Sequence, residues 1–327
     1  MPFPAKRLRR LRRSESLREL ARDTRLDASD LVCPVFVDES GGSPGIESMP
    51  GLSRVSPRDV AAEAGEIREL GIRAVMLFGI PSSKDSAGSA AHAGDGVVQR
   101  AIRDIRAAHG DALAIMADTC LCQYTDTGHC GIAGGGGEIE NDASLAALSR
   151  VAVSQARAGA DVVSPSAMMD GQVSAIRAAL DAAGHGDVAI MSHSAKHASS
   201  FYAPFRDAAS CAPQFGDRRT YQVPYTSSRA AMQEVAADIE EGVDIVMIKP
   251  ALAYLDVIAE ARRRFDVPVA AYSVSGEYAL VKAAAERGMV DGGAVATEIL
   301  HAIRRAGAGI IVTYFAREAA AALRGGK

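Results

Sequence analysis

The sequence predicts an α/β protein of the (β/α)8 TIM-barrel class with an N-terminal extended or helical arm. The first observation is that eight short apolar segments alternate with longer segments rich in Ala and Leu. Near-continuous apolar runs are typical of parallel strands covered on both faces. The second observation is composition, because 327 residues with 48% hydrophobic content and no Trp suit helices packed on a buried sheet. Eight strand–helix units in series favour a closed barrel, with a doubly wound open sheet as the alternative.

The N-terminal segment differs from the rest, which predicts an arm at residues 1–28 and a catalytic barrel at residues 29–327. Between Ala5 and Asp27 there are nine Lys or Arg against four Asp or Glu. Such a basic segment is expected to be a solvated or partner-binding arm, with nucleic-acid binding or targeting as the alternative.

The strands follow in order along the chain, each rich in Val, Ile, Ala and Met. Their expected starts are Val32, Ile72, Ala112, Ala160, Val188, Asp244, Pro268 and Ala308.

Helices are predicted where apolar residues recur at helical spacing. The first has Ser56 as its cap and Pro57 in its first turn. The second begins after Asn141 as N-cap and ends at Gly159. Segments 227–244 and 276–288 follow the same scheme.

Charge and composition argue against nucleic-acid-binding, membrane-spanning and secreted proteins. The net charge of −4 gives no global field for nucleic acid. No apolar run approaches the roughly 18 residues of a membrane span, and the N-terminus lacks a signal-peptide core. Five cysteines, an odd number, favour a reducing, cytoplasmic compartment. We therefore expect neither a nucleic-acid nor a membrane partner.

Polar residues end six successive strands of the predicted barrel. In such barrels the active site lies at the carboxyl ends of the strands, so these side chains are expected to share one rim. They are Asp118, Ser164, Ser166, Ser194, Lys196, Lys249, Ser273, Ser275, Thr313 and Tyr314.

Two of these residues, Lys196 and Lys249, lie on neighbouring predicted strands. Burial and a second ammonium both lower the pKa of a lysine, and a neutral amine can attack a ketone. The pair therefore indicates Schiff-base chemistry on a carbonyl substrate. The alternative is that a lysine pairs with Asp118 and only orders the core.

Groups suited to anions follow in the sequence. Arg206 and Arg218 come after the fifth strand, and arginine is suited to bidentate binding of carboxylate. Hydroxyls of Ser275 and Tyr314 offer a second carboxylate site. Isolated arginines are usually solvated, so this pair alone is a weak signal.

Three cysteines lie in an eleven-residue window directly after the third strand: Cys120, Cys122 and Cys130. They allow a disulfide, a metal site or three buried thiols.

Longer motifs resemble porphobilinogen synthase, the 5-aminolevulinate dehydratase family. They are DTCLCQYTDTGHCG, SPSAMMDGQVSAIRAAL, SHSAKHASSFYAPFRDAA, DIVMIKPALAYLD, YSVSGEYAL and IIVTYFARE, and the resemblance covers nearly the whole chain. It implies a barrel whose arm wraps a neighbouring subunit, usually in a homo-octamer. It also implies condensation of two 5-aminolevulinate molecules to porphobilinogen, with loss of two waters, for tetrapyrrole (haem) biosynthesis.

The resemblance also implies roles for individual residues. Lys249 forms the Schiff base with the first substrate and Lys196 with the second, beside the polar residues Asp118 and Ser166. The resemblance implies that one substrate carboxylate is bound by Arg206, Arg218 and Gln222 and the other by Ser275 and Tyr314. It implies that Zn²⁺ is bound by Cys120, Cys122 and Cys130. It also implies that an allosteric Mg²⁺ depends on Glu234.

Three thiolates suit zinc and leave a fourth position open, which is typical of a catalytic site. The glycine-rich segment after Cys130 is interpreted as a mobile lid. Cys33 is expected to be a core thiol, and Cys211 matches no metal motif.

The chain departs from the family pattern at Gln123, Ala167, Gln172 and His193. The lysines, cysteines and arginines are intact, so the chemistry is expected to persist. The alternatives are a divergent copy in a specialised pathway, a Schiff-base aldolase that needs one essential lysine, and a non-catalytic protein that stores zinc or binds a partner.

Overall fold

The computed structural model describes residues 6–42 and 44–325; the outermost parts of the predicted arm and barrel, residues 1–5 and 326–327, lie outside the described residues. Eight parallel strands close into a barrel in the order β1-β10-β9-β8-β7-β6-β3-β2, which confirms the predicted fold class. The barrel strands are β1 (Leu31–Asp38), β2 (Ala74–Ile80), β3 (Ala114–Thr119), β6 (Val162–Pro165), β7 (Ala189–Lys196), β8 (Ile245–Lys249), β9 (Val269–Ser273) and β10 (Ile310–Thr313).

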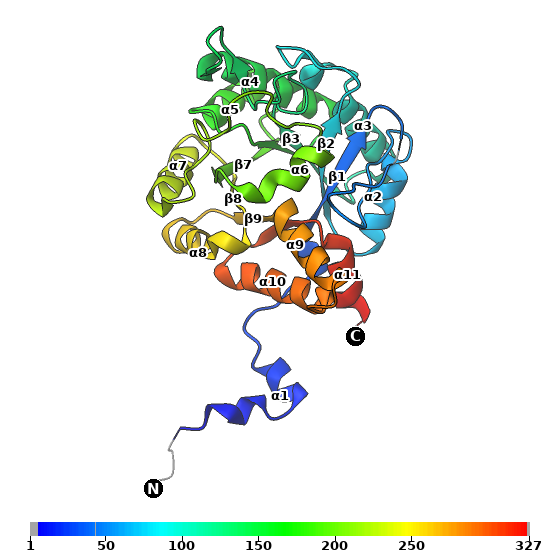
Figure 1. Ribbon diagram of the computed structural model, residues 1–327, viewed down its shortest axis with the longest axis vertical. Coiled ribbons are helices and arrows are strands. Elements are labelled where there is room, and N and C mark those ends of the chain that lie inside the picture. Colours follow the sequence, from blue (N-terminus) through cyan, green and yellow to red (C-terminus); the bar gives the residue numbers. More distant parts are fainter. Residues whose placement is uncertain (1–5, 43, 326–327) are drawn as a thin grey trace.

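Helices surround the barrel, and the short α6 lies across its opening (Figure 1). The α-helices are α1 (Glu15–Leu20), α2 (Val60–Glu69), α3 (Val97–His109), α4 (Asn141–Ala158), α5 (Gln172–Ala182), α6 (Ala203–Ala208), α7 (Ser228–Glu240), α8 (Leu255–Arg264), α9 (Ser275–Glu286), α10 (Gly292–Ala306) and α11 (Ala316–Gly325). Short 3-10 turns are η1 (Leu8–Arg12), η2 (Ala28–Asp30), η3 (Ser89–His92), η4 (Ser200–Tyr202) and η5 (Leu252–Tyr254), and β4 (Ile132–Ala133) and β5 (Ile139–Glu140) form a separate hairpin.

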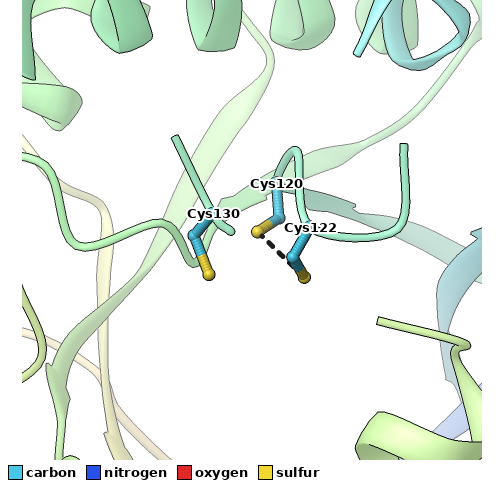
Figure 2. A group of neighbouring side chains, drawn as sticks. All are labelled: Cys120, Cys122 and Cys130. Carbon is cyan, nitrogen blue, oxygen red and sulfur yellow. Dashed lines mark hydrogen bonds between the residues drawn. The ribbon is translucent and has the colours of Figure 1, made fainter. Parts of the chain in front are cut away.

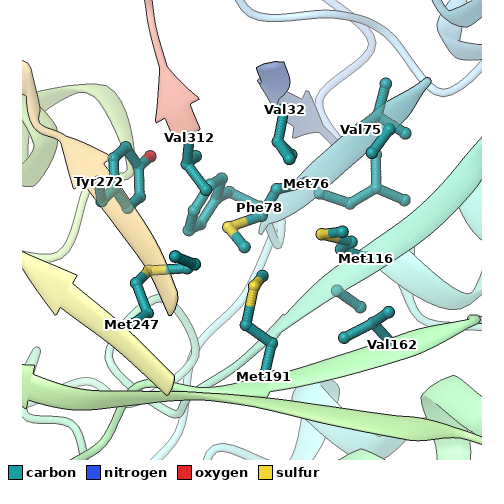
Figure 3. Packing of buried hydrophobic residues seen from close by; sticks show 14 of the residues in the cluster. Val32, Val75, Met76, Phe78, Met116, Val162, Met191, Met247, Tyr272 and Val312 are labelled. Atoms are coloured by element: carbon teal, nitrogen blue, oxygen red, sulfur yellow. The ribbon is translucent and has the colours of Figure 1, made fainter. Parts of the chain in front are cut away.

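The barrel interior is filled by side chains (Figure 3). Met76, Met116, Met191 and Met247 come from four different strands, and each is at most 6% exposed. Phe78 packs with them at 1% exposure. The lower barrel is therefore a packed core rather than a pore, and in such barrels the site lies at the carboxyl ends of the strands.

Two helix starts differ from the predictions. Helix α2 begins at Val60 with Asp59 as N-cap, since Ser56 instead donates its hydroxyl hydrogen bond to Asp59 in the preceding turn. Asn141 is the first residue of α4 rather than its cap, because its side-chain amide bonds the backbone of Asp170. The predicted end at Gly159 is confirmed by its left-handed φ of 105°.

The described part of the arm extends away from the barrel (Figure 1). It contains η1 and α1, and neither has a buried residue. Leu8, Leu11 and Leu20 are 67%, 56% and 79% exposed. Such apolar side chains on a basic segment lack a covering surface in the single chain. In the part of the chain that the structure describes, no helix is long and apolar enough to cross a membrane.

Candidate active site

Lys196 and Lys249 lie side by side at the carboxyl ends of β7 and β8, where strand pairing places them at the same level. They are 5% and 6% exposed and line one cavity together with Asp118 and Ser166. The structure therefore brings the four predicted catalytic residues together.

Lys249 is surrounded by aromatic rings. Its Nζ lies 4.4 Å from the ring centroid of Tyr272, 5.2 Å from that of Tyr202 and 5.9 Å from that of Phe205. Burial, and then the charge of Lys196, lower the pKa of Lys249 to about 7. A large fraction of this amine is therefore neutral near pH 7 and able to act as a nucleophile.

Lys196 has a different environment. Its Nζ donates a hydrogen bond to the backbone oxygen of Ser166. Burial opposes its charge, but the negative thiolate of Cys130 and the other two thiols of the cluster raise the pKa of Lys196 above its ordinary value. Near pH 7, Lys196 thus stays protonated, whereas Lys249 is only partly protonated, which distinguishes the two amines.

Asp118 is fixed by two hydrogen bonds. Ser166 Oγ donates to Oδ1 at 2.7 Å, and Gln123 Nε2 donates to Oδ2 at 2.9 Å. Burial nevertheless raises the pKa of Asp118 above its ordinary value. Gln123, one of the departures from the family pattern, therefore supports the carboxyl group beside the lysines.

The segment of residues 199–222, called the covering segment below, closes the lysine cavity. It contributes Tyr202, Phe205 and Arg218 to the lining. The space left inside is ≈ 20 Å³, room for about one water molecule. Substrates must therefore displace part of the covering segment to reach the lysines.

The predicted lid after Cys130 is not what covers this cavity. None of the described lining residues comes from 131–142, which form the β4–β5 hairpin and the start of α4 instead. Gly137 and Ile139 line a neighbouring cavity of ≈ 750 Å³. A run of glycines indicated flexibility but carried no information about position.

The three thiols of Cys120, Cys122 and Cys130 gather at the same rim (Figure 2). Their sulfur atoms lie within 4.8 Å of one another, all three are buried, and Cys120 Sγ lies 3.5 Å from Cys122 Sγ. All three are free thiols, so the disulfide alternative is not borne out. Hydrogen bonds from Cys120 and Cys122 hold the pKa of Cys130 well below its ordinary value. The cluster could hold a metal ion.

Arg206, Arg218 and Gln222 line a second cavity of ≈ 370 Å³ outside the lysine cavity, and Arg218 lines both. Within the described residues, the buried Nε of each arginine and both polar atoms of the Gln222 side chain have no hydrogen-bond partner. Unpaired buried donors are costly, so this arrangement is suited to a ligand with acceptor oxygens.

Ser275 and Tyr314 lie near the lysine cavity but do not line it. Ser275 Oγ accepts from the backbone N–H of Phe205 at 3.0 Å and lies 3.2 Å from the backbone oxygen of Phe201. Tyr314 OH accepts from Tyr272 OH at 2.9 Å. Both lie next to groups that surround Lys249, but neither lines its cavity in this closed arrangement.

Glu234 is half-buried on α7 and lines a cavity of ≈ 300 Å³ with Asp170, Asp238 and Glu241. Burial, and then Asp170 and Asp238, raise the pKa of Glu234. Burial also raises the pKa of Asp238 to about 6, and its Oδ2 has no hydrogen-bond partner among the described residues. The lining of this cavity is rich in carboxylate oxygens and, among the described residues, includes no basic side chain.

The remaining departures are all buried. Ala167 is 0% exposed. Gln172 Nε2 donates to Ser192 Oγ at 3.3 Å. Neither ring nitrogen of His193 has a partner among the described residues, and burial followed by the two lysines lowers the pKa of His193 well below its ordinary value.

Sequence reasoning missed the aromatic residues around Lys249 and the position of Cys211. The FYAPF stretch before Arg206 was a signal for the aromatic residues. Cys33 is a buried core thiol, as predicted. Cys211, predicted to belong to no metal motif, lies in the covering segment with its thiol against that of Cys122.

A lysine whose pKa is lowered beside one whose pKa is raised, a carboxyl group, a thiol cluster and an anion-binding cavity are together typical of a (β/α)8-barrel enzyme for carbonyl chemistry on a carboxylate-bearing substrate.

Comparison with known proteins identifies the family. The family model for delta-aminolevulinic acid dehydratase matches residues 5–322. The delta-aminolevulinic acid dehydratase of Methanothermobacter thermautotrophicus is 52% identical over 319 residues, 97% of each chain. That of Bacillus subtilis is 47% identical over 315 residues, 96% of this chain and 97% of the relative. The chain belongs to the delta-aminolevulinic acid dehydratase family, and it is an enzyme of that family.

A solved structure supports the same family assignment. Delta-aminolevulinic acid dehydratase (porphobilinogen synthase) of Toxoplasma gondii ME49, in complex with the reaction product porphobilinogen, is 44% identical with a TM-score of 0.95. The match covers 98% of this chain and 92% of that one. The predictions of the family, the barrel and the enzyme class are confirmed.

Proposed function

We propose that this enzyme condenses two molecules of 5-aminolevulinate to porphobilinogen with loss of two waters, through Schiff bases on its two lysines. The observation that carries the proposal is the pair of buried lysines with opposite pKa shifts in one cavity. Each substrate has a ketone for an amine to attack and a carboxylate. Arg206, Arg218 and Gln222 would bind one of the two carboxylates, and Ser275 and Tyr314 the other.

Lys249 is the first nucleophile, because about half of its amine is neutral near pH 7. The amine adds to the ketone of the first substrate, and loss of one water leaves an imine. Lys196 must lose a proton before its amine adds to the ketone of the second substrate, and loss of a second water then leaves the second imine. Asp118, linked to Ser166, is suited to transfer protons at these steps. The carbon next to the imine of one substrate loses a proton and attacks the imine carbon of the other, which forms the C–C bond. The amino group of that other substrate attacks the first imine carbon, which forms the C–N bond, and loss of a last C–H proton makes the ring aromatic. Each attack releases one lysine as its amine, and the covering segment excludes bulk water from these steps.

The thiol cluster fits zinc. Three buried thiols offer the soft ligands that zinc prefers, and three protein ligands are typical of catalytic zinc sites. When bound there, zinc supplies Lewis acidity for an oxygen of the substrate. Cys120, Cys122 and Cys130 would hold it.

The test combines turnover and trapping. The pure protein is incubated with 5-aminolevulinate under reducing conditions, and porphobilinogen is detected with an aldehyde reagent for pyrroles. Chelation should abolish activity and zinc should restore it; recovery by magnesium alone would contradict the zinc assignment. Borohydride should attach substrate to Lys249, and Lys249→Ala should be inactive while Lys282→Met, at an exposed ion pair, stays active.

A turnover-competent Lys196→Ala variant would instead favour the aldolase alternative. Metal binding without turnover of any amino ketone would favour the non-catalytic one.

The arm supports a homo-oligomer, and we expect an octamer. Its three exposed leucines need an apolar partner surface, which a second copy of the chain can supply. Sedimentation should therefore give a large assembly, and replacing Leu8, Leu11 and Leu20 by Ser should reduce its size. An unchanged assembly would show that the arm does not hold it together.

The acidic cavity around Glu234 supports a magnesium effector site. Carboxylate oxygens are the ligands that magnesium prefers. Magnesium should raise the activity of the zinc-loaded enzyme, and Glu234→Gln should remove that response while leaving the magnesium-free rate unchanged. Equal responses of both proteins would exclude Glu234 from the effect.

A further inference from the structure

A fourth thiol, Cys211, adjoins the cysteine cluster. It is 0% exposed, and its thiol interacts with that of Cys122. It is not a member of the group of three sulfurs that lie within 4.8 Å of one another. Cys211 is therefore next to Cys122, at one corner of the cluster.

The backbone around Cys211 is held firmly. Ser210, just before it, has a φ of 50°, a left-handed conformation that a non-glycine residue rarely adopts. Arg54 Nη2 donates to Ser210 Oγ at 3.1 Å, and Lys84 Nζ donates to the Ser210 backbone oxygen. Cys211 N donates to the backbone oxygen of Arg206 at 2.9 Å. These contacts direct Cys211 toward the interior.

The covering segment also contacts the loop that carries Cys130. Arg218 Nη2 donates to the backbone oxygens of Gly128 and Cys211, at 2.8 and 2.7 Å. A Cβ at Gly128 would lie 2.2 Å from the Ala212 oxygen, so the two backbones touch there. Arg218 is 4% exposed. Cys211 thus reaches the cluster from the element that must move when substrate enters.

We propose that Cys211 is a displaceable fourth thiolate ligand of the metal in the substrate-free enzyme. The inference rests on the proposed metal site. Three thiolates leave one tetrahedral position open, and Cys211 is the next thiol to the cluster. On binding, its sulfur loses a proton to solvent and gives the metal four thiolates, a closed set that cannot act on a substrate. Substrate would then exchange with Cys211, and the covering segment would be released at the same step.

Cobalt reports the number of thiolates, because the intensity of its sulfur-to-metal charge-transfer absorption rises with each cobalt–sulfur bond. Cobalt-loaded wild-type enzyme should lose about one quarter of this intensity in Cys211→Ser, since one of four thiolates is removed. Cys33→Ser, a buried thiol outside the site, is the matched control and should match the wild type. Adding 5-aminolevulinate should bring the wild type to the level of Cys211→Ser. Equal spectra for Cys211→Ser and the wild type would overturn the proposal.

Two further measurements separate its failure from that of the metal site. Cys120→Ser should lose tight cobalt binding; if it binds as the wild type does, the three-thiol site itself is wrong. X-ray absorption on zinc-loaded wild-type enzyme needs no variant and should count four sulfurs without substrate and three with it. Three sulfurs in both states would refute the role of Cys211 and leave the three-thiol site standing.

Discussion

Lys249 should form its Schiff base with a pH profile centred near 7 rather than near the ordinary lysine value. The burial of Lys249 and the charge of Lys196 give it a pKa of about 7 instead of 10.5. About half of the amine is then neutral at pH 7, against about one in 3,000 for an ordinary lysine, a gain of about 1,500-fold in reactive amine.

The assay uses levulinic acid, a ketone that has the carboxylate of the substrate but no amino group, so the reaction stops at the imine. Cyanoborohydride traps the imine, and mass spectrometry follows the labelling of Lys249 with time. The rate should rise with pH up to about 7 and then level off. Lys196→Gln removes the neighbouring ammonium, so its midpoint should move to higher pH.

The surface variant Lys282→Met controls for general effects on the protein and should leave the profile unchanged. A wild-type rate that still rises tenfold per pH unit above pH 9 would refute the reasoning, because Lys249 would then be an ordinary, charged lysine. An unchanged midpoint in Lys196→Gln would remove the second lysine as a cause of the shift.

Three further predictions follow from other sites. Gln222→Leu removes an unpaired buried amide, so kcat/KM for 5-aminolevulinate should fall about tenfold or more in steady-state kinetics, and an unchanged value would exclude it from substrate binding. Asp238 has a native pKa of about 6, raised from 3.8 mainly by burial, so the folded state binds more protons and loses stability as pH rises from about 4 to 6. In metal-free urea titrations Asp238→Asn should therefore be more stable by up to about 3 kcal/mol at pH 7 and about equal at pH 3; equal stability at pH 7 would contradict the argument. Ile102→Ala, at 0% exposure on α3, should lower the free energy of unfolding by about 2–5 kcal/mol, whereas Leu280→Ala, at 62% exposure, should have little effect.

The barrel could be predicted because each strand is apolar on both faces. The alternation of strand and helix then fixes which ends share a rim, so Asp118, Lys196 and Lys249 could be placed together from their positions alone. The helix starts were less predictable because several polar residues compete for them. Ser56 and Asn141 both have side chains suited to capping, but each bonds a different partner.

In the covering segment, the positions of the side chains could not be predicted from sequence patterns. After η4 and α6, residues 209–222 form no helix or strand, so no periodicity indicates which of their side chains point inward. Arg206 and Arg218 could be proposed from their chemistry, but Cys211 could not, because its neighbour Cys122 is distant in the sequence. The glycine-rich run after Cys130 was the more obvious sign of a lid, yet glycine reports only freedom of the backbone.

The covering segment controls both the pKa of Lys249 and the entry of substrate. Phe205 and Tyr202 remove water from Lys249, which lowers the pKa of that lysine. Arg218 lines both the outer, anion-binding cavity and the lysine cavity. A single displacement of the segment would therefore admit substrate and rehydrate Lys249, raising its pKa toward the charged form. The amine can become reactive again only when the segment closes over the bound substrate, so closure makes the nucleophile neutral at the moment its target ketone is in place.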